Sequence, residues 1–323
     1  MSVARDASER STAPRWLHAW AILTVCATVP MLLLGTEVTT KKVGMVDDHG
    51  FRFPWHMFTI PDVWARGIGF LIEHSHRLAA YTIGACIIVL AVGLWRREPR
   101  RWVRWAGMAA LAGVIIQGLL GGFRVQLNAL MGPRLALIHG CFAQLVFALL
   151  VSLAVFTSRS WSANASDDAD PRLRRWTLLV ACLSYLQIVL GALVRHTESP
   201  LGPRLHVWGA FALVAAVVWL ARLVFDKGIG GRSVRTSIGI LVAVVGLQIM
   251  LGVETWLAKF AASPEWPQLR PLTDRWQLIP SLHYLAGSCI FATAVVAALE
   301  AYRSVAWNVS LKPAPLGRLE GAA

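Results

Sequence analysis

Long apolar segments alternate with short polar segments along most of the chain. Each apolar segment is close to or above the roughly 20 residues that an α-helix needs to cross the hydrocarbon core of a bilayer. Eight such runs lie near residues 16–38, 67–95, 105–124, 134–157, 175–195, 204–225, 236–258 and 279–302. Because an α-helix satisfies its own backbone polar groups in lipid, we predict an all-α integral membrane protein with eight transmembrane helices.

The composition agrees with this prediction, and the placement of the charges adds an orientation. The 323 residues are 56% hydrophobic, with a formal net charge of +13. The termini and the connections after even-numbered runs hold 19 Lys and Arg, against 11 in the other connections. Since basic residues concentrate on the cytoplasmic side, we expect both termini in the cytoplasm and the chain in the inner (cytoplasmic) membrane. The concentration of basic loops on the cytoplasmic side of a lipid membrane then accounts for the net positive charge. We therefore expect membrane lipid, and no nucleic acid, as a partner.

A polar segment between the fourth and the fifth apolar run divides the chain into two halves. Residues 158–174 are rich in Ser, Asp and Ala and are typical of a flexible linker. We therefore predict two pseudo-symmetric four-helix bundles, at 16–157 and 175–303. Cytoplasmic tails at 1–15 and 304–323 complete the predicted domain organisation.

An internal repeat supports this division. The segments "QGLLGGFRV" (117–125), "QIVLGALVR" (187–195) and "QIMLGV" (248–253) each lie at the outer end of an odd-numbered run, and "LLGTEV" (33–38) is a weaker copy. The first two are followed by "GPRLALIHG" (132–140) and "GPRLHVWGA" (202–210). Glycine-mediated helix packing explains the glycines, but it does not explain why Gln, Gly and His recur in this order.

One histidine lies near the start of each even-numbered run, about 5–14 Å into the predicted helix. These residues are His76, His139, His206 and His283. A single intramembrane histidine is usually a packed or hydrogen-bonded residue, but four at a similar depth favour paired metal ligands. Two imidazoles that converge inside a four-helix bundle form a haem-iron site, so we pair His76 with His139 and His206 with His283. Zinc fits poorly because each half lacks a third and a fourth ligand.

Two further sets of charged residues accompany the histidines. Glu73, His76 and Arg77 share one helix face, so Glu73 either accepts a proton in a reaction or forms a structural ion pair with Arg77. Arg134 and Arg204, at helix starts, are candidate partners for haem propionates, or else interfacial arginines whose charged ends reach water. A di-iron site would need a second Glu-x-x-His motif and two more glutamates in the same bundle, whereas the chain has one such motif and few other intramembrane acids, with Glu254 near a helix end.

The five cysteines suggest no disulfide and no covalent haem attachment. All of them lie within apolar runs, and no Cys-x-x-Cys-His motif occurs: Cys26, Cys86, Cys141, Cys182 and Cys289. We expect them to be small apolar packing residues.

Two longer motifs, in order, give the chain a family resemblance. "EHSHR" (73–77) is similar to the Glu-x-x-His-Arg signature of the haem A synthases, and "LGALVRHTES" (190–199), after Gln187, is similar to their segment at the end of the fifth helix. The resemblance covers roughly residues 16–303. One departure is the first outer loop, residues 41–66, which lacks the cysteine pair of many bacterial members.

The resemblance implies a membrane-bound haem-dependent oxidoreductase that oxidises a methyl group of haem O to a formyl group, giving haem A for cytochrome oxidase. By similarity, the second half holds a haem b cofactor through His206 and His283, with Arg204 beside it. The first half would hold the substrate haem near His76, His139 and Arg134, with Glu73 and Arg77 in catalysis. Haem O synthase and the cytochrome oxidase assembly machinery are the implied partners.

Two other classes of protein remain as alternatives. A bis-histidine b-type cytochrome would carry electrons between two haems, but it has no need of Glu73. A transporter would fit eight helices and an internal repeat, but it predicts helices broken by Gly or Pro at mid-membrane. The Gly and Pro residues here concentrate near helix ends.

Overall fold

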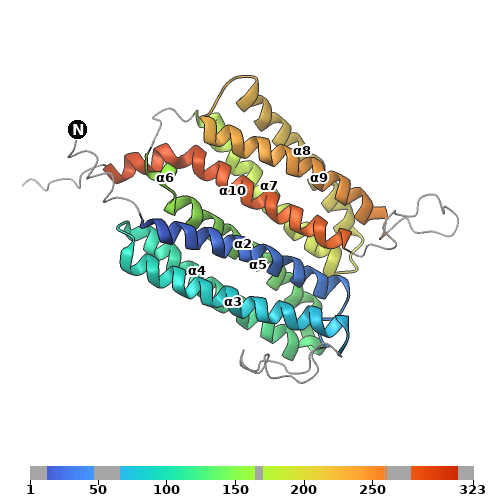
Figure 1. The fold of residues 1–323 in the computed structure, drawn as a ribbon. Coiled ribbons are helices and arrows are strands. Elements are labelled where there is room, and N and C mark those ends of the chain that lie inside the picture. Colours follow the sequence, from blue (N-terminus) through green and yellow to red (C-terminus); the bar gives the residue numbers. More distant parts are fainter. Residues whose placement is uncertain (1–12, 47–65, 164–169, 258, 260–277, 312–323) are drawn as a thin grey trace, which may run out of the picture.

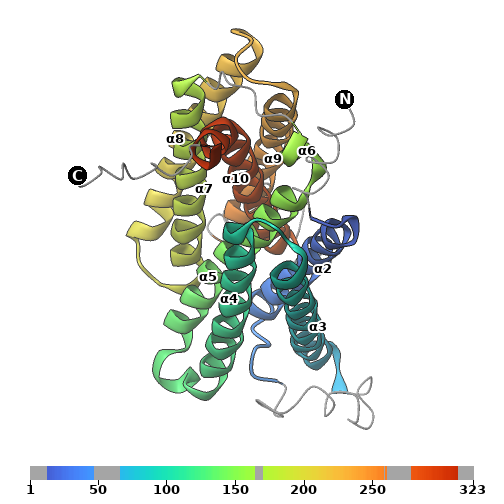
Figure 2. The same cartoon turned by 90° about the vertical axis from the view of Figure 1, so that its left-hand side faces the viewer.

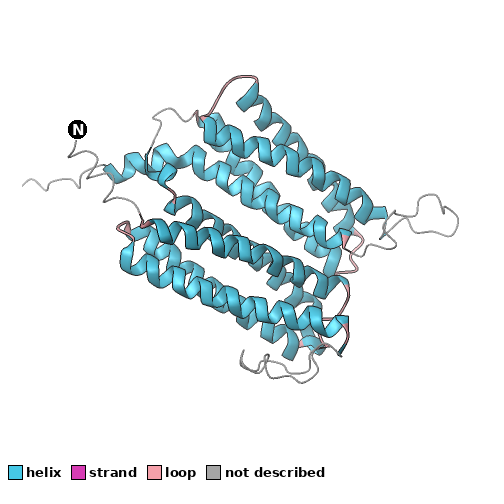
Figure 3. Ribbon diagram, in the orientation of Figure 1, coloured by secondary structure: helices cyan, strands magenta, loops and turns pink. Residues whose placement is uncertain are grey.

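The computed structural model describes residues 13–46, 66–163, 170–257, 259 and 278–311. Every regular element within these ranges is helical, as Figure 3 shows. The elements are α2 (Arg15–Thr40), α3 (Ile68–Arg97), α4 (Arg101–Gln126), α5 (Asn128–Thr157), α6 (Arg159–Ala163), α7 (Pro171–His196), α8 (Leu201–Phe225), α9 (Arg232–Trp256) and α10 (Ile279–Leu311).

Eight of these helices are long and apolar enough to cross a membrane, which confirms the prediction of an all-α multi-pass membrane protein. They are α2 to α5 and α7 to α10. Several begin earlier than the apolar pattern suggests: α4 starts at Arg101 rather than near 105, and α5 at Asn128, ahead of Pro133. Backbone hydrogen bonding continues beyond the apolar stretch, so apolarity alone does not mark the helix end. The short helix α6 occupies the start of the predicted linker.

The eight helices run side by side in two groups (Figures 1 and 2). Helices α2, α3, α4 and α5 pack on one another, and α7, α8, α9 and α10 form the second group. The groups meet where α10 contacts α2 and α5, and where α5 contacts α7. With eight spans, the start of α2 and the end of α10 lie on the same side, at the left of Figure 1. The pseudo-symmetry of the two groups stays a prediction.

Each group has its own apolar core. In the first, buried side chains such as Leu17, Ile87 and Leu153 form one cluster. In the second, Leu220, Ile238 and their neighbours form another. Lipid tails are as apolar as these side chains, so close packing rather than the hydrophobic effect holds such helices together.

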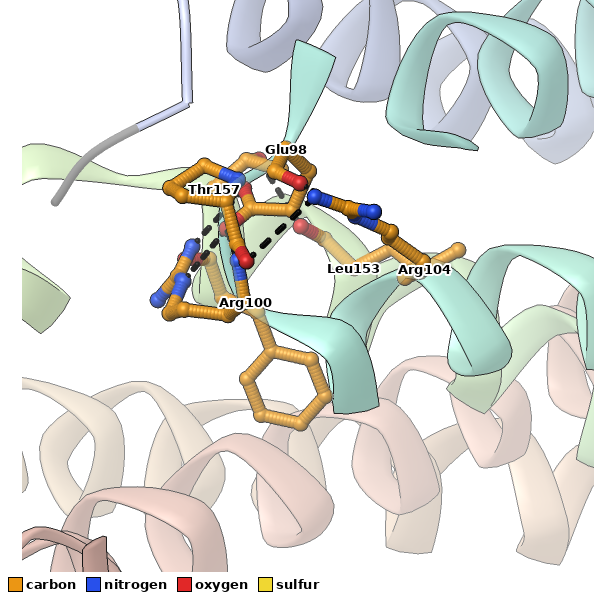
Figure 4. A network of polar contacts seen from close by, with 7 residues as sticks. Glu98, Arg100, Arg104, Leu153 and Thr157 are labelled. Carbon is orange, nitrogen blue, oxygen red and sulfur yellow. Dashed lines mark hydrogen bonds and ion pairs between the residues drawn. The ribbon is translucent and has the colours of Figure 1, made fainter. Parts of the chain in front are cut away.

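The end of the first group opposite the four histidines is fixed by a buried ion pair (Figure 4). The Glu98 carboxylate, fully buried, accepts from Arg100 Nε at 2.6 Å. Arg100 also donates to the Phe156 carbonyl at 2.8 Å, and Arg104 donates to the Glu98 carbonyl at 2.6 Å. These bonds tie the turn between α3 and α4 to the end of α5. These contacts join α3, α4 and α5 at the end opposite the histidines.

Candidate functional site

All four predicted histidines lie against a glycine of the preceding long helix. The glycine has no side chain, so the imidazole Cε1 approaches the glycine backbone more closely than another residue would allow. A Cβ atom built on the glycine would lie this far from Cε1: 2.8 Å for Gly35 and His76, 3.3 Å for Gly121 and His139, 3.1 Å for Gly191 and His206, and 3.1 Å for Gly252 and His283. The repeat glycines thus form four matched notches, one for each imidazole.

The residue one helical turn before each glycine also reaches the histidine. Gln117 donates to the main-chain carbonyl of His139 at 3.0 Å, and its amide lies 3.2 Å from His139 Nε2. Gln187 donates to the main-chain carbonyl of His206 at 2.6 Å. The amide of Gln248 lies 3.5 Å from His283 Nε2. This explains why Gln, Gly and His recur together in the sequence.

On α2 a methionine stands where the other three helices have glutamine. His76 Nδ1 lies 3.3 Å from the main-chain carbonyl of Met31, four residues before Gly35. The first copy of the repeat therefore keeps the glycine notch and a main-chain contact but lacks the side-chain amide.

His206 and His283 form a facing pair in the second group. Their ring centres are 6.2 Å apart and their planes are inclined by 81°. Two imidazoles that bind one iron from opposite sides, through bonds of about 2 Å each, have ring centres roughly 6 Å apart. Nδ1 of each ring is buried and has no hydrogen-bond partner among the described residues. The spacing and the donor type fit an iron held between two histidines.

In the first group, His76 and His139 come to the same end of the bundle, each in its own notch. Within the described ranges, no group of three or more His, Cys, Asp or Glu side chains is arranged around a common metal position. A pair of histidines is a donor set that suits haem, whose porphyrin supplies the other four ligands.

The predicted Glu73–Arg77 pairing is present. Arg77 Nη2 lies 2.8 Å from Glu73 Oε1, and Oε2 accepts from the main-chain N–H of Val46 at 2.8 Å. Only 3% of Glu73 is exposed. The carboxylate is thus buried, oriented by two donors, and one helical turn from His76. His74, on the other side of the helix, stacks on Phe70 at a ring distance of 5.3 Å.

Arg134 and Arg204 are exposed near the starts of α5 and α8. Their assignment to haem propionates remains a prediction. All five cysteines are free. Cys141 is buried and Cys86 and Cys289 are half-buried, but Cys26 and Cys182 are exposed on their helices, so the expected packing role fits Cys141 and does not fit these two.

Sequence reasoning missed two arginines that lie just beyond the repeat glycines. Arg124, three residues after Gly121, interacts electrostatically with Glu73, and a Cβ on Gly44 would lie 2.9 Å from its guanidinium. Arg195, four residues after Gly191, donates to the Thr36 carbonyl at 2.6 Å. Their sequence signal is that each arginine follows a repeat glycine by about one helical turn, in "GGFR" and "GALVR".

A tyrosine next to His283 was also missed. Tyr284 donates to the Gly140 carbonyl at 3.1 Å and accepts from Gln144 at 2.7 Å. The Arg195 guanidinium lies over its ring, 5.7 Å from the centre. Tyr284 thus links the residue after His283 to the residue after His139.

Lys259, beyond the end of α9, completes this polar region. Its ammonium donates to the Val194 carbonyl at 2.6 Å. Burial lowers the pKa of Lys259 from its ordinary value, and repulsion by Arg195 lowers it further. Positive charge is therefore concentrated where the two groups meet, at the end that carries the histidines.

Comparison with known proteins agrees with this arrangement. A family model described as "Cytochrome oxidase assembly protein" matches residues 63–202, a segment that includes Glu73, His76 and His139. The chain is similar to this family over that segment, which is less than half of its length.

Individual relatives are similar to the chain over longer segments. A "Heme A synthase" of Lysinibacillus sphaericus is 34% identical over 194 residues, which is 55% of this chain and 58% of the relative. One of Shouchella clausii is 28% identical over 197 residues, 60% of this chain and 61% of the relative. One of Listeria monocytogenes is 25% identical over 267 residues, 74% of this chain and 85% of the relative. The chain thus spans about three fifths of the length of the first two relatives.

Proposed function

We propose that this protein is a haem A synthase, which oxidises a methyl group of haem O to a formyl group to give haem A for cytochrome oxidase. The observation that carries the proposal is the buried Glu73–Arg77 pair, one turn from His76 on the same helix. No acidic residue stands three positions before the other three histidines. The family and the names of the relatives support the same activity. A protein that only carries electrons has no need of an oriented carboxylate beside one of two haem positions.

The residues of the second half fit a resident haem b. His206 and His283 would bind its iron, and Arg204 is the candidate partner for a propionate. A haem b held there supplies one-electron transfer. The 6.2 Å separation of the rings and their unpartnered Nδ1 atoms support this assignment.

The residues of the first half fit the substrate haem. His76 and His139 would hold it in position, with Arg134 as a candidate propionate partner. Arg77 orients Glu73, whose Oε1 it contacts at 2.8 Å. Glu73 would accept a proton at the reacting methyl group. General acid–base catalysis of this kind contributes typically about 10²–10⁴-fold to rate.

The cellular setting is part of the proposal. We infer an inner-membrane protein with both termini in the cytoplasm, supplied by a haem O synthase and serving the assembly of cytochrome oxidase. The unequal distribution of Lys and Arg supports this orientation. A C-terminal reporter that is active only in the periplasm would contradict it.

The activity is tested by expressing the chain with a haem O synthase in a host that makes no haem A of its own. Haems are extracted and identified by mass spectrometry. We expect haem A when the chain is present and only haem O when it is absent. If purified protein holds haem b while the cells contain unaltered haem O and no formylated or hydroxymethyl haem, the electron-carrier alternative replaces the proposal.

A further inference from the structure

Arg124 lies in the last turn of α4, at the end of the first group that carries the histidines. We propose that Arg124 is a substrate-binding residue whose guanidinium pairs with a propionate carboxylate of the substrate haem. This pair would hold the porphyrin in one rotation about the axis through His76 and His139. The inference rests on the proposed binding of the substrate haem between these two histidines.

The place of Arg124 on α4 is related to the glycine notch that seats His139. Arg124 follows Gly121 by three residues, so it lies about 4.5 Å nearer the end of the helix and is rotated by only about 60° around it. The side chain therefore leaves α4 on nearly the same face as the notch, between His139 and the end of the bundle.

The side chain of Arg124 crosses the end of the bundle. In the first group α3 and α5 each pack against both α2 and α4, so α2 and α4 lie at opposite corners. The guanidinium nevertheless reaches the turn after α2, since a Cβ atom on Gly44 would lie 2.9 Å from its Nη2. His76 and His139 are carried by the other two corners, α3 and α5. Arg124 thus spans the end of the bundle between the two helices that carry the proposed iron ligands.

The guanidinium of Arg124 is charged and lacks a partner within the described ranges. The residue is half-buried, and it forms no hydrogen bond or ion pair with the described residues. Taking an arginine out of water costs free energy unless an acceptor compensates for the loss. Arg195, which follows the notch glycine of His206 in a similar way, already donates to the Thr36 carbonyl and to Thr40 Oγ1, both at 2.6 Å. Of these two arginines, Arg124 is the one whose donors can bind a ligand.

A propionate fits these donors in charge and in shape. The planar guanidinium forms two parallel hydrogen bonds with a carboxylate. Arg134, the propionate partner suggested by the sequence, is placed less favourably. It precedes His139 by five residues, so the two side chains leave α5 about 140° apart. Arg134 is also exposed, and water can satisfy its donors.

A carboxylate anchor would also decide which part of the porphyrin is oxidised. Two axial histidines fix the iron but allow the porphyrin to turn about the axis through them. Val46, two residues after Gly44, donates its main-chain N–H to Glu73 Oε2 at 2.8 Å. The same turn therefore contacts Arg124 and orients Glu73. An anchored propionate would set which methyl group lies near the Glu73 carboxylate, and orientation of this kind is a large part of catalysis.

The test compares haem O with its dimethyl ester, in which both propionates are neutral. Each is titrated into purified protein whose second half holds haem b, and binding to the first half is followed by difference absorbance. We expect the wild-type protein to bind the acid more tightly than the ester. In Arg124→Gln this preference should fall by about 10–100-fold, which corresponds to the loss of a hydrogen bond between charged groups. The affinity for the ester should change little.

Arg101→Gln is the matched control, because Arg101 is exposed at the start of the same helix. It should keep the wild-type preference for the acid. Arg124→Lys keeps the charge but not the two parallel donors, so it should lose a smaller part of the preference. This variant keeps the inference testable if Arg124→Gln does not fold, and retention of haem b in the second half reports folding.

A wild-type preference for the acid in both Arg124 variants would overturn the inference, and a preference lost in Arg134→Gln instead would assign the propionate to Arg134. Equal binding of acid and ester by the wild-type protein would also overturn it, even if the cells make haem A. If the preference falls as expected but no haem A is made, the carboxylate anchor stands and the synthase activity fails. A wild-type protein whose first half binds no haem O would overturn both.

Discussion

The two halves hold their histidines in the same kind of glycine notch but surround them with different side chains. The residue three positions before His76 is Glu73, whereas Ala136, Pro203 and Pro280 stand three positions before the other histidines. The notch is thus the shared device for seating an imidazole. Among the four histidines, His76 alone has an oriented carboxylate, that of Glu73, three positions before it on its own helix. This carboxylate marks the half in which we expect the reaction.

Acidic side chains near the outer helix ends do not distinguish the halves in this way. Glu37 follows Gly35 by two residues, and Glu254 follows Gly252 by two, and each has one buried carboxylate oxygen without a partner among the described residues. Neither shares a helix with the histidine in that notch. The comparison therefore depends on the place of Glu73 relative to His76 rather than on the number of acids in each half.

The largest expected effect is the loss of a ligand from the second half. His283→Ala removes one of the two facing imidazoles, so we expect the low-spin haem b spectrum of the purified protein to disappear. His18→Ala is the control, because His18 contacts Thr157 at the opposite end of the first half. An unaltered low-spin spectrum in His283→Ala would show that His206 and His283 do not share a haem.

The next effect separates chemistry from binding in the first half. Glu73→Gln keeps the shape and can still bond with its neighbours, but it cannot accept a proton. We expect conversion of haem O to fall about 10²–10⁴-fold while haem b stays bound. Conversion is measured by mass spectrometry of extracted haems and haem b by absorbance.

Glu300→Gln is the control for loss of a carboxylate, since Glu300 pairs with Arg303 near the end of α10, far along the helix from His283. It should convert haem O at the wild-type rate. If Glu73→Gln also makes haem A at that rate, Glu73 is a structural partner of Arg77, and the difference between the halves is not catalytic.

The sequence predicted the features that depend on residues close together along the chain. Helix number follows from the apolar runs, and the Glu73–Arg77 pair from a spacing of four residues. The depth of His139 was underestimated, because α5 begins at Asn128 and not near Pro133. The contacts that join the halves could not be predicted in this way. Tyr284 and Gln144 are 140 residues apart, and Arg195 and Thr36 are 159 apart, so their meeting depends on how whole helices pack.

A smaller effect on haem retention is expected when alanine replaces a glycine that forms a notch. In Gly35→Ala the new Cβ would lie 2.8 Å from His76 Cε1, so the ring must move, whereas in Gly252→Ala the distance to His283 Cε1 is 3.1 Å and a shift of a few tenths of an ångström suffices. We expect haem retention to fall in both variants, and more in Gly35→Ala. Gly246→Ala is the control on α9, because nothing lies within 4 Å of its added Cβ.

Equal retention in Gly252→Ala and Gly246→Ala would mean that the notch does not position His283. If Gly35→Ala retained haem as well as the wild type, the notch at Gly35 would not position His76. The two results are independent, because the glycines lie in different halves.

The smallest expected effect concerns the link between the halves. Tyr284→Phe keeps the ring beneath Arg195 but removes the hydroxyl that accepts from Gln144 and donates to the Gly140 carbonyl. Because both partners lie on α5 and Gln144 is buried, the loss should cost about 1 kcal/mol of stability. The measurement is thermal unfolding in detergent, with Tyr302→Phe as the control, since Tyr302 is more than a third exposed. A shift no larger than that of Tyr302→Phe would mean that packing alone joins the halves, and that neither half depends on this bridge to keep its histidines in place.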